Sequence, residues 1–512
     1  MAEIGYLLGI DLGTSSVKVN LVEPERGIVG LAGKAYPIDT PFSDWAEQDP
    51  NAWWEATCQA IRQVFLECDI DPRQVRGVGL SGQMHGLVIL DENGQVIRPA
   101  IIWPDKRSKN ECRLIPSLID PDLLYQITGI PIATGFYGTS LLWLREHEPE
   151  SYTRARIALL PKDYIRYKLT GELATDVTDA SGTLLQDIRQ RIWSEQIVES
   201  MGLRRSLLPL ILESSEIAGY VTKKACEVTG LPAGTIVAAG GGDQAMAAVG
   251  TGAITKGIVA SNLGSGGQLI TSIHHPITDP GHRIHTMCHA LKDSWLLMGA
   301  ILAAGLSLRW FKENFGLGED LINKINNINP YELITLEAKG SEPGSAGLIF
   351  LPYMAGERTP YMDPDATGCF FGLRLTHTRA HVIRAIMEGV AFAMKDSLEI
   401  FRELEIPITT IVSSGGGAKS KLWRQILADV YQEPIISLAH DEHSSYGAAL
   451  IAGLACGVFT TINEFVATKT AYREISYPIK ENIPIYERQY ALYRSLYPAL
   501  KSLFPRTYDD NS

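Results

Sequence analysis

The sequence predicts an α/β protein made of two related halves that hold a ligand in a central cleft between them. The first observation is an internal repeat, because the segment Asp11–Ser16 has a counterpart, Asn262–Gly267, about half a chain later. The second is an alternation of short apolar runs with helical stretches, which is typical of layered α/β folds. The third is a length of 512 residues at 45% hydrophobic composition, which is enough for two or three domains with large cores.

The first half opens with an apolar run, Ile4–Ile10, which is followed by a turn of small residues and a second run, Val17–Val22. Apolar residues at 17, 19 and 21 alternate with mostly polar ones, and this is the period of a strand. The pattern predicts a hairpin with Asp11–Ser16 at its tip. Further elements predicted in this half are a helix that begins at Asp49-Pro50 and strands at Gln74–Leu80 and Thr235–Ala239.

The second half repeats the hairpin, with runs at Ile258–Ser261 and Gln268–Thr271. The two tips differ in numbering by 264 − 13 = 251 residues, although two unrelated glycine turns are the alternative interpretation. The apolar run Trp295–Leu306 is too short to span a bilayer and is predicted as a buried core helix. Other elements predicted here are helices at Ala380–Phe401 and Leu422–Tyr431 and a strand at Ile408–Val412.

Charge and cysteine usage exclude several classes of protein. The net charge of 46 − 58 = −12 argues against nucleic acid or an anionic membrane as the main partner. The seven cysteines include no CxxC pair, so neither a disulfide framework nor a zinc site is expected. Because the first residues also lack a basic segment, no signal peptide is expected, and the chain is predicted to be reduced and cytosolic.

The two hairpin tips are predicted to bind phosphate. Glycine allows close approach of the backbone, while amide and hydroxyl groups donate hydrogen bonds to phosphate oxygens. Asp11 in the first tip would hold the magnesium ion that accompanies a polyphosphate, whereas the matching Asn262 is neutral. The predicted phosphate-binding residues are Gly13, Thr14 and Ser15 in the first tip, and Gly264, Ser265 and Gly266 in the second.

Two further glycine loops each follow a predicted strand. Gly415–Gly417 with Ala418 leaves room for a flat or anionic group, and a tight strand-to-helix turn is an equally good interpretation. Gly240–Gly242 places Asp243 at the start of a helix, where a plain capping role is the simpler interpretation. The functional interpretation of Asp243 is a general base for a hydroxyl nucleophile, kept ionised by the helix dipole.

Two segments carry side chains that suit a sugar. Met84 and His85 follow a predicted strand and could contact a sugar hydroxyl, although His85 also fits a buried packing role. Trp103 and Asp105 combine an aromatic face with a carboxylate, which is the set that binds carbohydrate. The alternative for this second segment is a strand end with an exposed turn.

Common motifs of other enzyme classes are missing, since the sequence has no GxxxxGK[ST], HExxH or GxSxG, and no complete GxGxxG follows a predicted strand. Ordered segments along nearly the whole chain instead resemble the FGGY family of carbohydrate kinases. These segments are Gly9–Ser15, Trp45–Pro50, Gly82–Gly86, Leu160–Tyr164, Gly240–Asp243, Leu351–Tyr353, Gly356–Pro360, Gly415–Ala418 and Gly447–Ala449.

The resemblance implies two actin-like (ribonuclease H-like) domains, expected here at residues 1–251 and 252–512. The first would bind the sugar and carry the first phosphate loop, and the second would carry the second phosphate loop and bind adenosine. Asp243 matches the catalytic proton acceptor, Met84-His85 match a pair that contacts xylulose, and Asp11 matches the aspartate of the first phosphate loop. The implied ligands are ATP, magnesium and D-xylulose. No nucleic acid or membrane partner is expected, and a homodimer is one compatible assembly.

Two departures from the family pattern bear on the substrate. The second loop carries Gly266 where a serine is usual, and Pro104 replaces the usual asparagine and so removes an amide donor. A kinase of another ketose or polyol, such as ribulose, is therefore an alternative. A non-catalytic sugar sensor and an actin-like assembling ATPase are alternatives from other classes.

Overall fold

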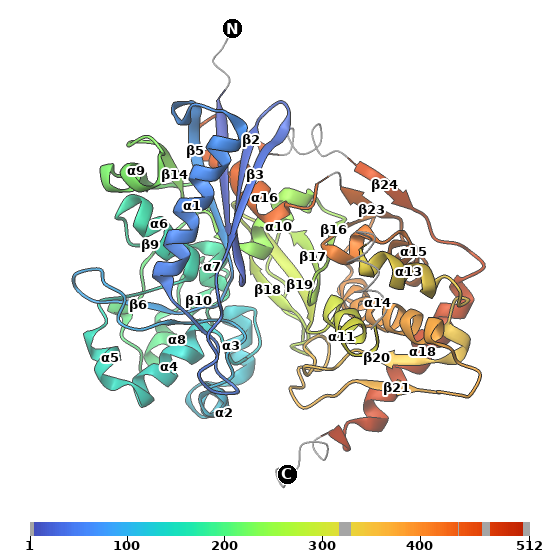
Figure 1. Cartoon of the computed structure of the whole chain (residues 1–512). Coiled ribbons are helices and arrows are strands. Elements are labelled where there is room, and N and C mark those ends of the chain that lie inside the picture. The colour runs from blue at the N-terminus through green and yellow to red at the C-terminus, as the bar shows by residue number, and fades with distance from the viewer. Residues whose placement is uncertain (1–4, 317–328, 439, 463–471, 505–512) are drawn as a thin grey trace.

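The computed structural model shows two α/β bodies side by side (Figure 1). It describes residues 5–316, 329–438, 440–462 and 472–504. None of the helices in these ranges combines the length and the apolar character that crossing a bilayer requires. Each body is built on one large sheet, and each sheet begins with one of the two predicted hairpins.

The first sheet has the strand order β13-β14-β5-β1-β2-β3. Strands β1 (Tyr6–Leu12) and β2 (Ser16–Glu23) are antiparallel, with Leu12 opposite Val17 at the tip, so the predicted hairpin is confirmed. Ile4 lies outside the described residues. The other strands of this sheet are β3 (Gly27–Ala35), β5 (Val75–Gly82), β13 (Ile217–Tyr220), β14 (Ile236–Ala238) and β15 (Gly241–Gly242), and β5 runs parallel to β1.

The second sheet repeats this arrangement in the order β24-β23-β22-β16-β17-β19-β18. Its hairpin is β16 (Ile258–Leu263) with β17 (Gly267–Ile273), and β22 (Thr410–Ser414) lies parallel to β16 as β5 lies parallel to β1. The remaining strands are β18 (His285–Cys288), β19 (Trp295–Ile301), β23 (Ile435–Leu438) and β24 (Tyr472–Ser476). The duplication inferred from the two tips therefore extends across both sheets.

The prediction of a buried helix at Trp295–Leu306 is wrong. This run forms strand β19, which ends at Ile301, and helix α11 (Gly305–Phe315) begins after it. All residues of β19 are buried, and the strand lies between β17 and β18. A strand covered on both faces gives a continuous apolar run, and periodicity alone cannot separate such a run from a buried helix.

The predicted long helices are confirmed. Helix α1 (Pro50–Cys68) begins where the sequence places it, and the Asp49 carboxylate accepts a hydrogen bond from the Asn51 amide at 2.9 Å. In the second body, α14 (Arg379–Glu403) takes the corresponding place between β19 and β22, and α15 (Lys421–Tyr431) follows β22. These helices pack on the sheets and complete the two cores.

The other helices of the first body are α2 (Lys109–Leu118), α3 (Pro121–Thr128), α4 (Tyr137–His147), α5 (Pro149–Arg154), α6 (Pro161–Thr170), α7 (Val177–Ser181), α8 (Glu195–Ser200) and α9 (Lys223–Thr229). Its short strands are β4 (Glu47–Gln48), β6 (Val88–Leu90), β7 (Ala100–Ile101), β8 (Ile157–Leu159), β9 (Ala174–Asp176), β10 (Gln186–Asp187), β11 (Ile192–Trp193) and β12 (Leu210–Leu212). The second body adds α13 (Pro330–Ala338), α18 (Ile483–Leu500), β20 (Ile349–Leu351) and β21 (Cys369–Phe371).

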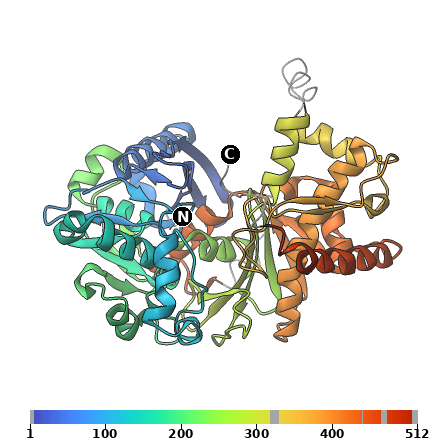
Figure 2. The same cartoon turned by 90° about the horizontal axis from the view of Figure 1, so that it is seen from below.

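Two helices join the bodies at the centre of the molecule, α10 (Asp243–Thr251) and α16 (His443–Ala455) (Figures 1 and 2). They pack so closely that a Cβ atom at Gly250 would lie 2.1 Å from the His443 carbonyl oxygen, and one at Gly447 would lie 1.9 Å from that of Met246. Only glycine fits such a contact. The domain boundary expected between residues 251 and 252 falls at the end of α10 and stays a prediction.

Candidate active site

Asp11 and Asp243 lie near each other, at the carboxyl ends of β1 and β15, both of which pair with β5. Asp11 is opposite Ser81 in the β1–β5 pair, and Gly242, directly before Asp243, is opposite Gly82 in the β15–β5 pair. The Ser81 hydroxyl donates to Asp11 Oδ1 at 2.7 Å. Both aspartates are half-buried, and neither carboxylate forms an ion pair within the described ranges. Ligands of α/β sheets commonly bind at this edge.

The environment of Asp243 raises the pKa of its carboxyl group to about 7. Burial is the main cause, the negative charge of Asp11 adds to it, and hydrogen bonds from Gln244 oppose it. Desolvation therefore opposes the helix dipole that was expected to keep this carboxylate ionised, and the net effect is a raised pKa. Asp243 is the first residue of α10 and Gly242 is the N-cap, so Asp243 is not a plain capping residue. A carboxyl group with a pKa near 7 suits a general base.

The pair of carboxylates fits a divalent cation. Burial also raises the pKa of Asp11, although Ser81 and Lys18 act in the opposite direction. The Lys18 ammonium does not neutralise the pair, since it lies 2.9 Å from the Glu442 carboxylate. Two neighbouring acidic side chains without a paired cation are the oxygen ligands that Mg²⁺ prefers.

The first phosphate loop is held by side chains from three other segments. The Tyr36 hydroxyl donates to the Gly13 carbonyl at 2.5 Å, and the Gln48 amide donates to the Thr14 carbonyl at 2.8 Å. The Trp103 indole donates to the Thr14 hydroxyl at 2.9 Å. An indole N–H can only donate, so the Thr14 hydroxyl accepts from Trp103 and keeps its own proton for another acceptor. The loop thus presents a directed donor, and Ser15 beside it is exposed.

The second phosphate loop and the third glycine loop lie against each other. Gly415 has φ +81°, and a Cβ there would lie 2.6 Å from the Asn262 side-chain oxygen. Gly264 and Ser265 line a cavity of about 800 Å³ together with Gly416 and Gly417. Gly266, Gly415 and Ala418 do not line it, and Ala418 instead lines a neighbouring cavity of about 290 Å³. The structure therefore brings most of the two predicted loops to one ligand-sized space in the second body.

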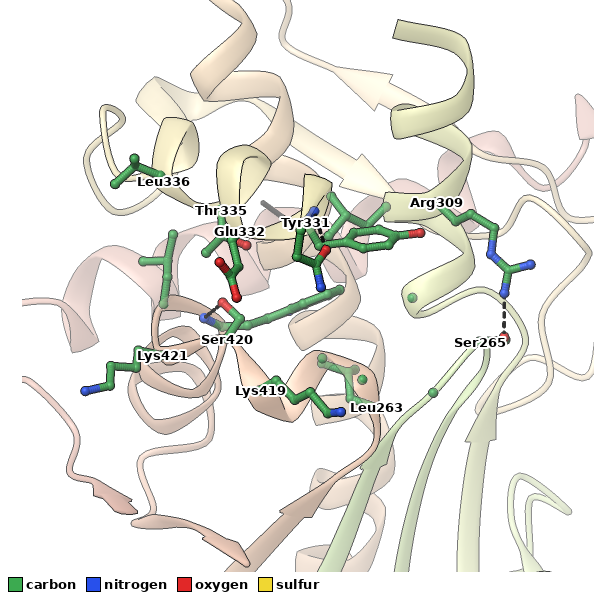
Figure 3. Close-up of a pocket in the computed structure, with 18 of the residues that line it drawn as sticks. Leu263, Ser265, Arg309, Tyr331, Glu332, Thr335, Leu336, Lys419, Ser420 and Lys421 are labelled. Carbon is green, nitrogen blue, oxygen red and sulfur yellow. Dashed lines mark hydrogen bonds between the residues drawn. The ribbon is translucent and has the colours of Figure 1, made fainter. Parts of the chain in front are cut away.

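Basic and aromatic side chains surround the larger cavity (Figure 3). Arg309 donates to the Ser265 hydroxyl at 3.0 Å, and Lys419, Tyr331 and Glu332 lie around the same space. Arginine beside a hydroxyl-bearing glycine loop suits a phosphate oxygen, and a flat apolar lining suits a nucleobase. Sequence reasoning missed Arg309, because a single arginine on an amphipathic helix carries no distinguishing pattern.

Met84 and His85 lie next to the loop that carries Asp243. A Cβ at Gly242 would lie 2.8 Å from the Met84 side chain, and a Cβ at Gly182 would lie 3.0 Å from Met84 and 3.1 Å from His85. His85 Nδ1 is 2.7 Å from the Gly182 carbonyl oxygen, so Nδ1 carries the proton. Burial lowers the pKa of His85 to about 3, which keeps the ring neutral. His85 also has φ +71°, in the left-handed region that non-glycine residues seldom adopt.

Asp105 differs from its predicted role. Its carboxylate accepts hydrogen bonds from the Ala46 amide at 2.7 Å and from the Arg107 backbone and guanidinium at 2.8 to 2.9 Å. Arg107 in turn stacks on Trp45, with its guanidinium carbon 3.6 Å from the ring centroid. Because both oxygens of Asp105 are engaged and the side chain is buried, it positions this segment instead of contacting the sugar.

A buried ionic network supports the glycine loop before Asp243. The Lys162 ammonium lies 2.5 Å from Asp163, 2.8 Å from Asp176 and 3.2 Å from Asp179, and all four side chains are fully buried. Thr178 links this network to the loop, because its hydroxyl donates to Asp176 at 2.6 Å and accepts from the Gly242 amide at 2.9 Å. The network fixes the backbone from which Asp243 projects.

Comparison with known proteins agrees with this geometry. Residues 6–250 match the N-terminal domain, and residues 259–456 the C-terminal domain, of the FGGY family of carbohydrate kinases. A xylulose kinase of Bacillus subtilis is 34% identical over 97% of this chain and 98% of its own length, and a gluconokinase of the same organism is 30% identical over 93% of both chains. The crystal structure of a xyloylose kinase from Brucella ovis, also 34% identical, superposes with a TM-score of 0.87 over 97% of this chain and 100% of that one. The two-domain, actin-like α/β fold implied by the sequence is confirmed.

Proposed function

Because the chain belongs to the FGGY family of carbohydrate kinases, we propose that it transfers the γ-phosphoryl group of ATP to D-xylulose. The acceptor would be the terminal primary hydroxyl, and the product would be D-xylulose 5-phosphate. The observation that carries the proposal is Asp243, whose pKa is about 7, near Asp11 and directly after Gly242, which packs against Met84. The similarity to xylulose kinases supports this acceptor. Because the chain is also similar to a gluconokinase, the activity with D-xylulose should be compared with that on sugar acids and on other ketoses.

In the proposed mechanism the Asp243 carboxylate removes the proton from the sugar hydroxyl. The hydroxyl oxygen forms a bond to the γ-phosphorus as the bond between that phosphorus and the β–γ bridging oxygen breaks, and ADP leaves. The tips at Gly13–Ser15 and Gly264–Gly266 donate hydrogen bonds to the phosphates, and the cavity beside Gly416 and Gly417 holds the adenosine. Mg²⁺, held at Asp11, would supply positive charge that offsets the charge on the phosphates.

A coupled assay of ADP release across several acceptors tests the proposal. Purified full-length protein is given ATP, Mg²⁺ and one acceptor at a time: D-xylulose, D-ribulose, gluconate or glycerol. The proposal predicts that D-xylulose has the highest kcat/KM. A higher value for another acceptor would contradict the substrate, and sugar binding without ADP release would indicate a sensor. ATP turnover that needs no sugar and accompanies filament formation would indicate an assembling ATPase.

Replacing Asp11 with asparagine is expected to weaken metal use and to shift the pH profile. Removing the carboxylate should raise the Mg²⁺ concentration for half-maximal rate by about tenfold or more. Asp11 also raises the pKa of Asp243, so the variant should keep its base ionised to a lower pH, and the acid limb of kcat/KM should move downward. Mg²⁺ titrations and pH profiles from 5 to 9 measure both effects. An unchanged Mg²⁺ requirement would show that Asp11 is not a ligand.

The variant Trp103→Phe isolates one hydrogen bond, because it keeps an aromatic ring and loses the N–H that orients Thr14. A neutral hydrogen bond contributes about 1 kcal/mol, so we expect a roughly fivefold loss in kcat/KM for ATP. The double variant with Thr14→Val should lose little more than Thr14→Val alone, since both changes remove the same interaction. Additive losses in steady-state kinetics would show that Trp103 acts independently of Thr14.

A further inference from the structure

A segment of the second body places an arginine at the junction of the two bodies. The Thr359 amide donates to the Ala300 carbonyl at 2.9 Å, and the Glu357 carboxylate accepts from the Leu302 amide at 3.2 Å. Ala300 belongs to β19 and Leu302 follows it, and this strand pairs with β17 directly after the second phosphate loop. The backbone of Arg358 is therefore fixed to the sheet that carries this loop.

The Arg358 side chain reaches the first body without finding an acceptor. Its guanidinium carbon lies 5.9 Å from the centroid of the Phe136 ring. Within the ranges that the structure describes, no oxygen accepts a hydrogen bond from its guanidinium and no carboxylate pairs with it. Burial lowers the pKa of Arg358, although the nearby Glu357 charge opposes this effect. A half-buried guanidinium has five N–H donors and no acceptor, so it requires oxygen atoms from a ligand or from water.

A second unpaired polar group faces the same ring. His285 on β18 is only 2% exposed, and neither of its ring nitrogens has a hydrogen-bond partner. Its ring centroid lies 6.4 Å from that of Phe136. Phe136 stacks on His85 at 4.1 Å with an interplanar angle of 12°, so the cluster continues into the predicted xylulose contact. Buried imidazole nitrogens without partners are rare in proteins and indicate a polar ligand or water.

The charges of these side chains, and the contacts that link them to Asp243, indicate what kind of ligand they would bind. Burial keeps His85 and His285 neutral, so these two rings offer donors and acceptors without charge beside the Arg358 cation. A chain of contacts links Gly242, directly before Asp243, through Met84, His85 and Phe136 to Arg358. A cation is excluded by the guanidinium, and a purely apolar group would leave both polar side chains unpaired.

We propose that Arg358 and His285 form a subsite of the second body that binds the carbonyl end of a ketose. The sugar would thus be held from both bodies, with its reacting hydroxyl at Asp243 and its carbonyl and neighbouring hydroxyl oxygens at Arg358. This inference rests on the proposed function and names Arg358 and His285 as residues that determine which sugar is bound.

Isothermal titration of D-xylulose into the full-length protein without nucleotide tests the subsite. Arg358→Met, which keeps volume but loses all donors, should weaken binding about 10- to 100-fold, the range for losing a hydrogen bond from a charged donor. Arg358→Lys should recover part of the loss, and His285→Phe should weaken binding less than Arg358→Met. The matched control is Arg283→Met, because the Arg283 guanidinium is paired with Asp279 and Glu403 and should leave sugar affinity unchanged.

Steady-state kinetics separate the subsite from a phosphate contact. The proposal predicts that Arg358→Met raises the KM for D-xylulose while the KM for ATP stays within about twofold of wild type. A raised KM for ATP, or a lower kcat with unchanged sugar affinity, would overturn the subsite in favour of a contact to the transferring phosphoryl group. If the wild type binds and phosphorylates D-ribulose or gluconate in place of D-xylulose, the proposed function fails, and the same variants on that acceptor still decide whether Arg358 binds it. Thermal unfolding of each variant shows whether it is folded.

Discussion

Replacing Asp243 with asparagine is expected to lower kcat by about 10²- to 10⁴-fold, the usual contribution of a general base. The amide keeps the shape of the side chain but cannot take the proton of the sugar hydroxyl. The KM values for ATP and sugar should change little, since the phosphate loops and Met84-His85 remain. Stopped-flow measurement of a single turnover with saturating ATP checks the chemical step directly.

The pH dependence of the wild type belongs to the same prediction. The pKa of Asp243 is about 7, so the ionised form dominates above this pH and is lost as the pH falls through it. We therefore expect kcat/KM to decrease below pH 7. The apparent pKa of this acid limb should be somewhat lower where bound Mg²⁺ stabilises the anion. The Asp243→Asn variant should lack this limb.

Asp396→Asn is the matched control for Asp243→Asn, because burial also raises the pKa of Asp396 to about 7. Its carboxylate accepts a hydrogen bond from the Tyr490 hydroxyl at 2.6 Å in the core of the second body. The control should keep its kcat and its acid limb. Near-wild-type turnover by Asp243→Asn, or an equal loss in the control, would show that Asp243 is not the base.

Replacing Lys162 with methionine is expected to cost about 3–5 kcal/mol of stability, because it removes the cation that contacts all three buried aspartates and leaves only Arg166, which pairs with Asp163. Burial alone lowers the pKa of Lys162, but the three aspartates outweigh burial and raise it, so the ammonium is charged. Lys168→Met is the control on the same helix, since Lys168 lies near Trp54 and Tyr164 and has no acidic partner within the described ranges. Urea unfolding of both variants measures the difference.

The pH dependence of Lys162→Met has a definite sign. Without the ammonium, buried carboxylates such as Asp179, whose pKa burial already raises, bind protons more tightly in the folded than in the unfolded state. The folded state then holds more protons, so stability falls as the pH rises. The variant should be less destabilised at pH 5 than at pH 8. Destabilisation that grows toward low pH would contradict this account of the network.

Much of the fold could be predicted from local patterns. The hairpin around Asp11–Ser16 and its repeat at Asn262–Gly267 are visible because small residues interrupt runs with strand periodicity, and Asp49-Pro50 marks a helix start by its capping chemistry. The strand at Trp295–Ile301 was not predictable, because burial on both faces removes the alternation that identifies a strand.

The site was predicted less completely, because its decisive contacts join residues far apart in the chain. Trp103 and Thr14 are 89 positions apart, and no local pattern shows that the indole serves the phosphate loop. Asp105 was misassigned although its partner, Arg107, is only two residues away, and this spacing was the available signal. Arg358 belongs to a segment with a family motif, but only the fold shows that it faces Phe136 of the other body.

The identity of the product tests the central claim most directly. Purified full-length protein is incubated with ATP, Mg²⁺ and D-xylulose, and ³¹P NMR spectra follow every phosphorus species over time. We predict that one ADP and one phosphomonoester on the terminal hydroxyl of the sugar appear for each ATP consumed, with no rise in inorganic phosphate. Inorganic phosphate in place of the sugar phosphate, or a phosphate on any other position of the sugar, would contradict phosphoryl transfer to the hydroxyl that Asp243 deprotonates.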